Sequence, residues 1–140
     1  MRYIFSSLIP SYYAILNGAI TVNSVVLPVY DGEVPPTQQG SYILLGDRNS
    51  TPMDGKGTQN TEVFLLVDVV IKGASMGFKD SDYAANQITA LINKDANPSG
   101  GVYWQVVTTN YSTNTLGGIN KTDNIFRTLI RFRHICNQIS

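Results

Sequence analysis

The sequence predicts an α+β fold, an antiparallel sheet of about four to five strands with two helices packed on one face. Three observations lead to this prediction. Apolar residues recur at helical spacing in two segments, and several other segments have the apolar pattern of strands. These elements follow one another as helix, two strands, long strand, helix and two strands, with no internal repeat. The length of 140 residues fits a single domain, which we expect to span residues 1–140.

A short amphipathic helix is expected near the N-terminus. Its apolar residues recur every three or four positions: Leu8, Ile9, Tyr12, Tyr13 and Leu16. A start at Ser6 or Ser7 as N-cap would place Pro10 in the first turn, where its missing N–H costs nothing. An earlier start would kink the helix at Pro10. Asn17-Gly18 supplies a C-terminal stop.

Two apolar strands come next, separated by a stiff connector. Residues 25–30 and 42–46 form the two expected strands. Between them, Asp31-Gly32 supplies a turn, and Pro35-Pro36 forces extended backbone without amide donors. We therefore expect a rigid, non-pairing corner between these strands. The polar segment from Asp47 to Asn60 has no apolar period and is predicted to form a long exposed loop.

The clearest strand runs from Thr61 to Lys72. One of its faces is entirely apolar, with Val63, Leu65, Val67, Val69 and Ile71. The other face is mixed, with Glu62, Phe64, Leu66, Asp68, Val70 and Lys72. We expect the mixed face to meet either a helix or a neighbouring subunit. A helix capped by Asp80 or Ser81 and ending near Asn93 follows, and its buried stripe comprises Ala84, Ile88, Leu91 and Ile92.

Two more strands complete the chain. The strand from Val102 to Ser112 is expected to place Trp104 and Val106 on one face, with Tyr103, Val107 and Tyr111 on the other. A glycine-containing link, Asn114 to Asn120, joins it to the final strand, Ile125 to Cys136. One face of the final strand carries Phe126, Ile130, Phe132, His134 and Cys136. Its opposite face carries Ile125, Arg127, Leu129, Arg131 and Arg133.

The composition favours a protein that packs against neighbours. Charged residues make up 14% of the chain, below the roughly 25% of typical soluble domains. Ten basic and ten acidic residues balance. A net charge of zero promotes association, and it argues against a chain whose main task is to grip nucleic acid. No apolar run reaches the length of a membrane span, so we expect no membrane partner.

No catalytic or cofactor site is expected. His134 and Cys136 share a strand face with Ile130 and Phe132, so we interpret both as core residues rather than as a nucleophilic pair. One histidine and one cysteine do not make a metal site of that kind. The segment around Lys56 lacks the spacing of a phosphate-binding loop, and Pro52 stands where a calcium loop needs glycine. The sequence therefore predicts a protein that is not an enzyme and holds no cofactor.

The arginines of the final strand are the most distinctive polar feature. Arg127, Arg131 and Arg133 share one strand face, where their charges would repel unless paired or solvated. The favoured interpretation is a solvated outer face. A functional interpretation remains open, in which they meet acidic residues of an adjacent subunit or line a passage for DNA.

Several segments, taken in order, carry a resemblance over nearly the whole chain. They are the N-terminal helix, Val29-Tyr30-Asp31-Gly32 with Pro35-Pro36, Tyr42-Ile43-Leu44-Leu45-Gly46, the polar loop, the strand Glu62–Ile71, the helix Asp80–Asn93 and Arg131-Phe132-Arg133. In this order they resemble the tail-completion proteins of tailed bacteriophages, also called tail terminator or tail-to-head joining proteins. Pro10 and the segment Asn97–Gly101 depart from that pattern.

The resemblance implies a small α+β subunit of a hexameric ring in the virion, at the head-proximal end of the tail. Such a ring stops growth of the tail tube, docks to the head connector on the portal side, and lets double-stranded DNA pass without sequence specificity. The subunit would be made in the host bacterial cytoplasm. The loops Asp47–Asn60 and Ser112–Asp123 match the variable extensions of the family. The expected subunit or lumen contacts are Arg127, Arg131, Arg133, Asp47, Arg48, Asp54, Lys56 and Lys121.

Two other roles stay open at this stage. The chain could be a neck or collar adaptor ring of a short-tailed phage. It could instead be a single-stranded nucleic-acid-binding module that stacks bases on Tyr103, Trp104 and Tyr111. Aromatic residues on strands more often belong to the core, which disfavours the second role.

Overall fold

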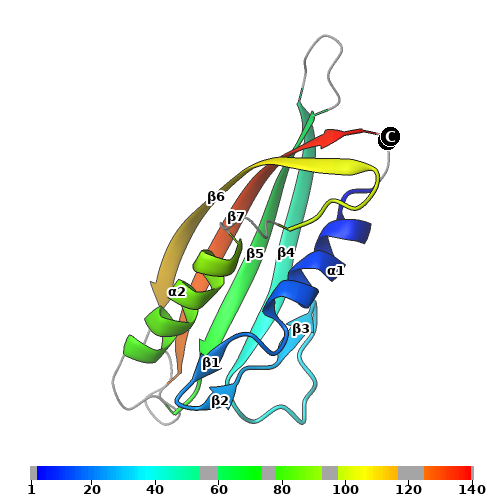
Figure 1. Ribbon diagram of the computed structural model, residues 1–140. Coiled ribbons are helices and arrows are strands. Elements are labelled where there is room, and N and C mark those ends of the chain that lie inside the picture. The colour runs from blue at the N-terminus through cyan, green and yellow to red at the C-terminus, as the bar shows by residue number, and fades with distance from the viewer. Residues whose placement is uncertain (1–2, 54–59, 74–77, 93–97, 117–124, 140) are drawn as a thin grey trace.

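A computed structural model describes residues 3–53, 60–73, 78–92, 98–116 and 125–139. In chain order the elements are α1 (Phe5–Leu16), β1 (Thr21–Val22), β2 (Val25–Val26), β3 (Val29–Asp31), β4 (Tyr42–Met53), β5 (Asn60–Ile71), α2 (Lys79–Ile92), β6 (Trp104–Leu116) and β7 (Phe126–Gln138). Both helices lie against the same face of a five-stranded sheet, so the predicted α+β fold class is confirmed (Figure 1).

The sheet has the strand order β3-β4-β5-β7-β6. The pairs β4–β5, β5–β7 and β7–β6 are antiparallel, as predicted. The β3–β4 pair is parallel over three residues, Val29–Asp31 against Ile43–Leu45. The predicted non-pairing connector is confirmed, because residues 32–41 contain no strand. This connector brings the chain back alongside β3, so the two strands that it joins lie side by side.

The predicted strand from Val25 to Tyr30 is divided in two. Asn23 and Ser24 have positive φ angles of 50° and 66°, which form a tight two-residue turn. The turn folds β2 back onto β1 as a separate two-stranded hairpin. Gln87 of α2 holds this hairpin, because its side-chain amide both accepts from and donates to the backbone of Thr21.

The predicted loop from Asp47 to Asn60 is largely strand. β4 continues to Met53, and Arg48–Met53 pairs with Asn60–Leu65 of β5 beyond a bulge after Leu45. Pairing between strands satisfies the backbone hydrogen bonds whatever the polarity of the side chains. The absence of an apolar period therefore did not exclude a strand in this segment. Residues 54–59, with the predicted contacts Asp54 and Lys56, lie outside the described residues.

The final hairpin is also longer than predicted. β6 extends to Leu116, so the first residues of the predicted link Asn114–Asn120 are strand, and the rest lie outside the described residues. A bulge between Val106 and Thr108 reverses the side-chain alternation of β6. Tyr111 consequently lies opposite Phe132, on the same face as Val106 opposite Cys136, and not on the opposite face as predicted.

Helix α1 begins earlier than the favoured prediction. Ile4 is its N-cap, with no side-chain capping bond, and Ser6 and Ser7 lie inside the helix. Pro10 is therefore internal to the helix rather than in its first turn. The predicted stop is confirmed, because Asn17 is the C-cap and Gly18 adopts a φ of +76°.

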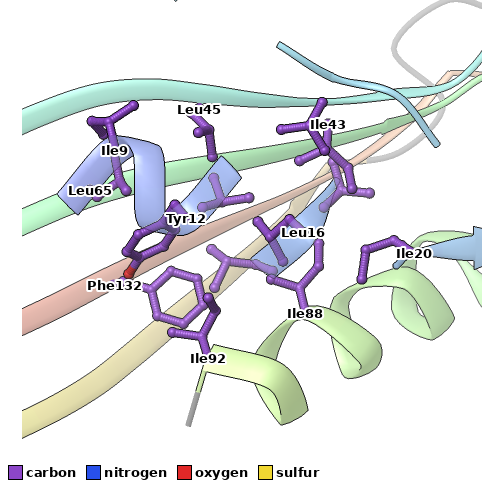
Figure 2. Close-up of a cluster of buried hydrophobic side chains, with 14 of the residues drawn as sticks. Ile9, Tyr12, Leu16, Ile20, Ile43, Leu45, Leu65, Ile88, Ile92 and Phe132 are labelled. Atoms are coloured by element: carbon purple, nitrogen blue, oxygen red, sulfur yellow. The ribbon is translucent and has the colours of Figure 1, made fainter. Parts of the chain in front are cut away.

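The core lies between the helices and the sheet. Figure 2 shows Tyr12 of α1 and Ile92 of α2 beside Phe132 of the sheet, with Leu16 of α1 beside Ile88 of α2. All of these side chains are fully buried. The apolar face predicted for β5 is confirmed, since Val63, Leu65, Val67, Val69 and Ile71 are all buried.

Candidate functional site

The face of the sheet opposite the helices is the candidate interaction surface, hereafter the open face. On β5 it carries the mixed residues Glu62, Phe64, Leu66 and Asp68, and on β7 it carries Arg127, Arg131 and Arg133. The register places Arg133 opposite Phe64, Arg131 opposite Leu66, and Arg127 opposite Val70. Antiparallel pairing of β5 and β7 thus brings the three predicted arginines beside the acids of the preceding strand.

Each arginine contacts its diagonal neighbour rather than the residue opposite. Arg133 contacts Glu62, Arg131 lies over Phe64, and Arg127 contacts Asp68. Every contact is displaced by two residues in the same direction along β5. A long side chain reaches such a diagonal neighbour in a twisted antiparallel pair.

The Arg127–Asp68 pair is the most buried of these contacts. The Asp68 side chain is 7% exposed and the Arg127 side chain 37%. The guanidinium donates to both carboxylate oxygens, with Nε 3.3 Å from Oδ1 and the second bond from Nη2 to Oδ2. The bond to Asp68 raises the pKa of Arg127, although burial opposes this shift. Because the Asp68 carboxylate is nearly buried, loss of Arg127 would leave it without its ion-pair partner in the chain.

The Arg133–Glu62 pair is more open to solvent. Arg133 Nε donates to Glu62 Oε2 at 2.8 Å, and the two side chains are 35% and 28% exposed. Solvent screens such a pair, so we expect a small contribution to stability.

Arg131 differs from its two neighbours. Its guanidinium carbon lies 4.1 Å from the centre of the Phe64 ring, a cation–π contact. The residue is exposed, and within the described part of the chain it forms no ion pair. Arg131 is therefore the arginine of the final strand whose charge is available to a partner.

Two shallow depressions on this side of the sheet bring further predicted residues together. One, of about 260 Å³, is lined by Asp47, Arg48, Asn49, Phe64, Leu66 and Arg131. The other, of about 480 Å³, shares Asp47, Arg48 and Leu66 with the first and extends to Asp68 and Arg127. Arg48 also forms an ion pair with Asp31 at the sheet edge. Arg133 lines neither depression, and Lys121, like Asp54 and Lys56, lies outside the described residues.

His134 and Cys136 are core residues, as predicted. Both are fully buried on the helix-covered face. The hydroxyl of Tyr12 bonds to Nε2 of His134, and Thr109 Oγ1 lies 3.0 Å from Nδ1. Burial lowers the pKa of His134 to about 4 and raises the pKa of Cys136 to about 11. A neutral imidazole and a protonated thiol fit a structural role.

The aromatic residues proposed as stacking platforms do not form one surface. Trp104 is 3% exposed and belongs to the core, and Tyr103 packs against that core. Tyr111 is 48% exposed. Base stacking needs accessible rings, so burial of Trp104 argues against the single-stranded nucleic-acid interpretation.

The partners of Arg127 and Arg133 were missed from the sequence, although a signal was present. Glu62 and Asp68 flank Phe64 and Leu66 on the mixed face of the long strand. When one strand carries acids on a face and a second strand carries arginines on a face, the two strands can form cross-strand ion pairs if they are neighbours in the sheet. The sequence alone did not establish that adjacency.

Among the described residues, no helix has the length and apolar character needed to span a membrane, and no group of three potential metal ligands occurs. No protein-family model matches the chain, and no curated protein matches it in sequence. Its fold is similar to that of a chain in a solved structure, the virion of a native gene transfer agent particle, with a TM-score of 0.65 and 16% sequence identity. The similarity covers 94% of this chain and 92% of that chain.

Proposed function

We propose that this protein is a structural component of a bacteriophage virion, and that it forms a hexameric ring at the head–tail junction. The observation that carries the proposal is the fold similarity over nearly the full length of both chains to a chain of a gene transfer agent virion. The order of sequence elements that resembles tail-completion proteins supports the same role independently.

The ring would act through its shape. In this role it terminates the tail tube, presents a docking surface to the head connector, and leaves a central passage for double-stranded DNA. A rigid subunit suits such a task. The five-stranded sheet backed by one continuous core supplies that rigidity.

The predicted contact residues take different parts in this proposal. Arg127, Arg133 and Arg48 each have a carboxylate partner within the chain, so they mainly shape the subunit. Arg131 and Asp47 are exposed at the first depression and are the better candidates for contacts with a neighbouring subunit or the lumen. Even one available arginine per subunit, such as Arg131, gives a ring of positive charges when the subunit is repeated.

An image of the particle tests the proposal directly. Particles carrying a tagged copy of this chain should show the tag as one ring between head and tail by cryo-electron microscopy. Cells lacking the chain should yield unjoined heads, or tubes of uncontrolled length. Complete, infectious particles that lack the chain would overturn the proposal, whereas a monomer in dilute solution would not, because the ring can form on the particle.

The same image separates the proposed position from its nearest alternative. A neck or collar adaptor would appear as a ring directly below the portal, on particles with short tails. A tail-completion ring would lie on the last layer of the tube. The fold similarity supports both positions equally.

A further inference from the structure

The edge strand β6 has an unusual composition for an exposed edge. It lies at one end of the strand order, and apart from an isolated bridge between Trp104 and Gly100 it pairs only with β7 within the described residues. None of its 13 residues is charged, and none is a proline. Every residue from Asn110 to Leu116 is exposed. Proteins usually protect such edges with charges, prolines or very short strands, because a free edge pairs readily with another strand.

Apolar side chains add to this edge. Val107 is the extra residue of the bulge, has no partner on β7, and is 56% exposed. Tyr111 is 48% exposed and Leu116 38%. A solvated edge gains nothing from these exposed apolar groups, whereas an edge covered by another chain would bury them.

The opposite edge of the same sheet is only partly covered. β3 pairs with β4 at Ile43–Leu45 and no further, so the segment Asn49–Met53 has no strand partner on that side among the described residues. This segment is exposed and uncharged. The segment contains Pro52, which is paired in register with Thr61 of β5 and which sheets accept at edges. The sheet therefore presents two different uncharged edges, one at each end.

We propose that β6 of one copy pairs with the Asn49–Met53 segment of β4 in the next copy, so that the sheet continues from subunit to subunit. The proposal rests on the proposed ring and names the contact that builds it. A head-to-tail contact between two different surfaces generates a ring when the rotation closes. Pairing of β6 with β6 of a second copy would instead give a closed dimer and leave the Asn49–Met53 segment uncovered.

The topology also fixes the direction of this pairing. Three successive antiparallel steps separate β4 from β6, so the two strands run in opposite directions within one subunit. A neighbouring copy that continues the sheet in the same orientation brings its β4 antiparallel to β6. The open faces of all copies then form one wall of the ring, and the helices form the other.

Cysteine crosslinking tests this contact. In β6, Asn110, Ser112 and Asn114 lie opposite open-face residues of β7, and in β4, Asn49 and Thr51 lie opposite open-face residues of β5. Double variants that combine Ser112→Cys with Thr51→Cys, and neighbouring combinations that sample the register, would be oxidised on purified particles. We expect at least one combination to give a ladder of covalent multimers up to the size of the ring. The corresponding single variants should stay monomeric on a non-reducing gel.

A matched control uses the two faces of the sheet. Ser50 lies opposite Val63, on the helix-covered side, so Ser50→Cys combined with Ser112→Cys places the thiols on opposite faces and should not crosslink. The natural Cys136 is buried, so the unmodified chain should not crosslink either.

The possible failures are distinguishable. A dimer from Ser112→Cys alone would overturn the proposal in favour of β6–β6 pairing. Rings in the particle with no crosslink from any combination would overturn this contact and leave the proposed function intact. Particles that contain no copy of the chain would overturn both.

Discussion

The two faces of the sheet are built from the same strands, but their side chains find different surroundings. On the helix-covered face, Leu65 and Phe132 face each other and are fully buried. On the open face, the arginines of β7 form ion pairs with acids of β5 and a cation–π contact with a phenylalanine. Most side chains on this face are only half-buried. The covered face thus contributes most of the folding free energy, while the open face remains able to contact a partner.

The first prediction compares one residue type on both faces. Phe132→Ala should lower the free energy of unfolding by about 4 kcal/mol, because it leaves a cavity in the core. Phe64→Ala, on the open face, should cost about 1 kcal/mol, because Phe64 is only half-buried and mainly loses its contact with Arg131. Urea unfolding monitored by circular dichroism measures both. Equal losses would show that a neighbouring chain or an unrecognised contact buries Phe64 as deeply as Phe132.

The second prediction concerns His134, the titratable imidazole of the covered face. Its surroundings, Tyr12, Thr109, Phe132 and Cys136, carry no charge that would stabilise an imidazolium. Burial lowers its pKa to about 4, below the 6.5 of an unfolded chain, so the unfolded state binds the proton more tightly. Stability is therefore complete above about pH 6.5 and falls as the pH drops toward 4, by about 3 kcal/mol from this group.

The pH dependence is measured by urea unfolding between pH 7 and pH 4. His134→Gln is the matched variant, since it keeps a polar group of similar size but does not titrate. In the variant, the free energy of unfolding should change much less between pH 6.5 and pH 4 than in the natural chain. This holds even if the variant is less stable at pH 7. An unchanged slope in the variant would assign the acid sensitivity to other groups.

The third prediction compares the two ion pairs of the open face. Arg127→Ala should cost about 2 kcal/mol, because it leaves the nearly buried carboxylate of Asp68 without its partner. Arg133→Ala should cost less than about 1 kcal/mol, because Glu62 remains solvated. Adding Asp68→Asn to Arg127→Ala should restore part of the loss. A failure to restore any stability would mean that Arg127 acts through packing rather than through its charge.

Local patterns in the sequence predicted the covered face well. Alternation in Val63–Ile71 identified the core side of β5, and the apolar neighbours of His134 and Cys136 identified both as core residues. These predictions depend on side-chain burial, which the apolar pattern reports directly. The arginine stripe was also recognised from alternation alone.

Features that depend on pairing between distant segments were not predictable in the same way. The outer half of β4 and the end of β6 are polar and became strands because neighbouring strands satisfy their backbones. One bulged residue, Val107, reversed the faces of β6 and moved Tyr111 to the side of Phe132. The partners of Arg127 and Arg133 likewise required the register of β5 against β7.

The last prediction has the smallest expected effect on folding and separates stability from assembly. Arg131→Ala should change the free energy of unfolding by less than about 1 kcal/mol, because the residue is exposed and loses one cation–π contact. Charge reversal with Arg131→Glu should leave the fold intact but reduce incorporation into particles, since it places a negative charge on the open face of every copy. Incorporation is measured by quantitative mass spectrometry of purified particles, with Lys79→Glu on α2 as a charge-reversal control on the other side of the sheet. Normal incorporation of Arg131→Glu would remove Arg131 from the contact surface and leave the strand edges as the route by which copies meet.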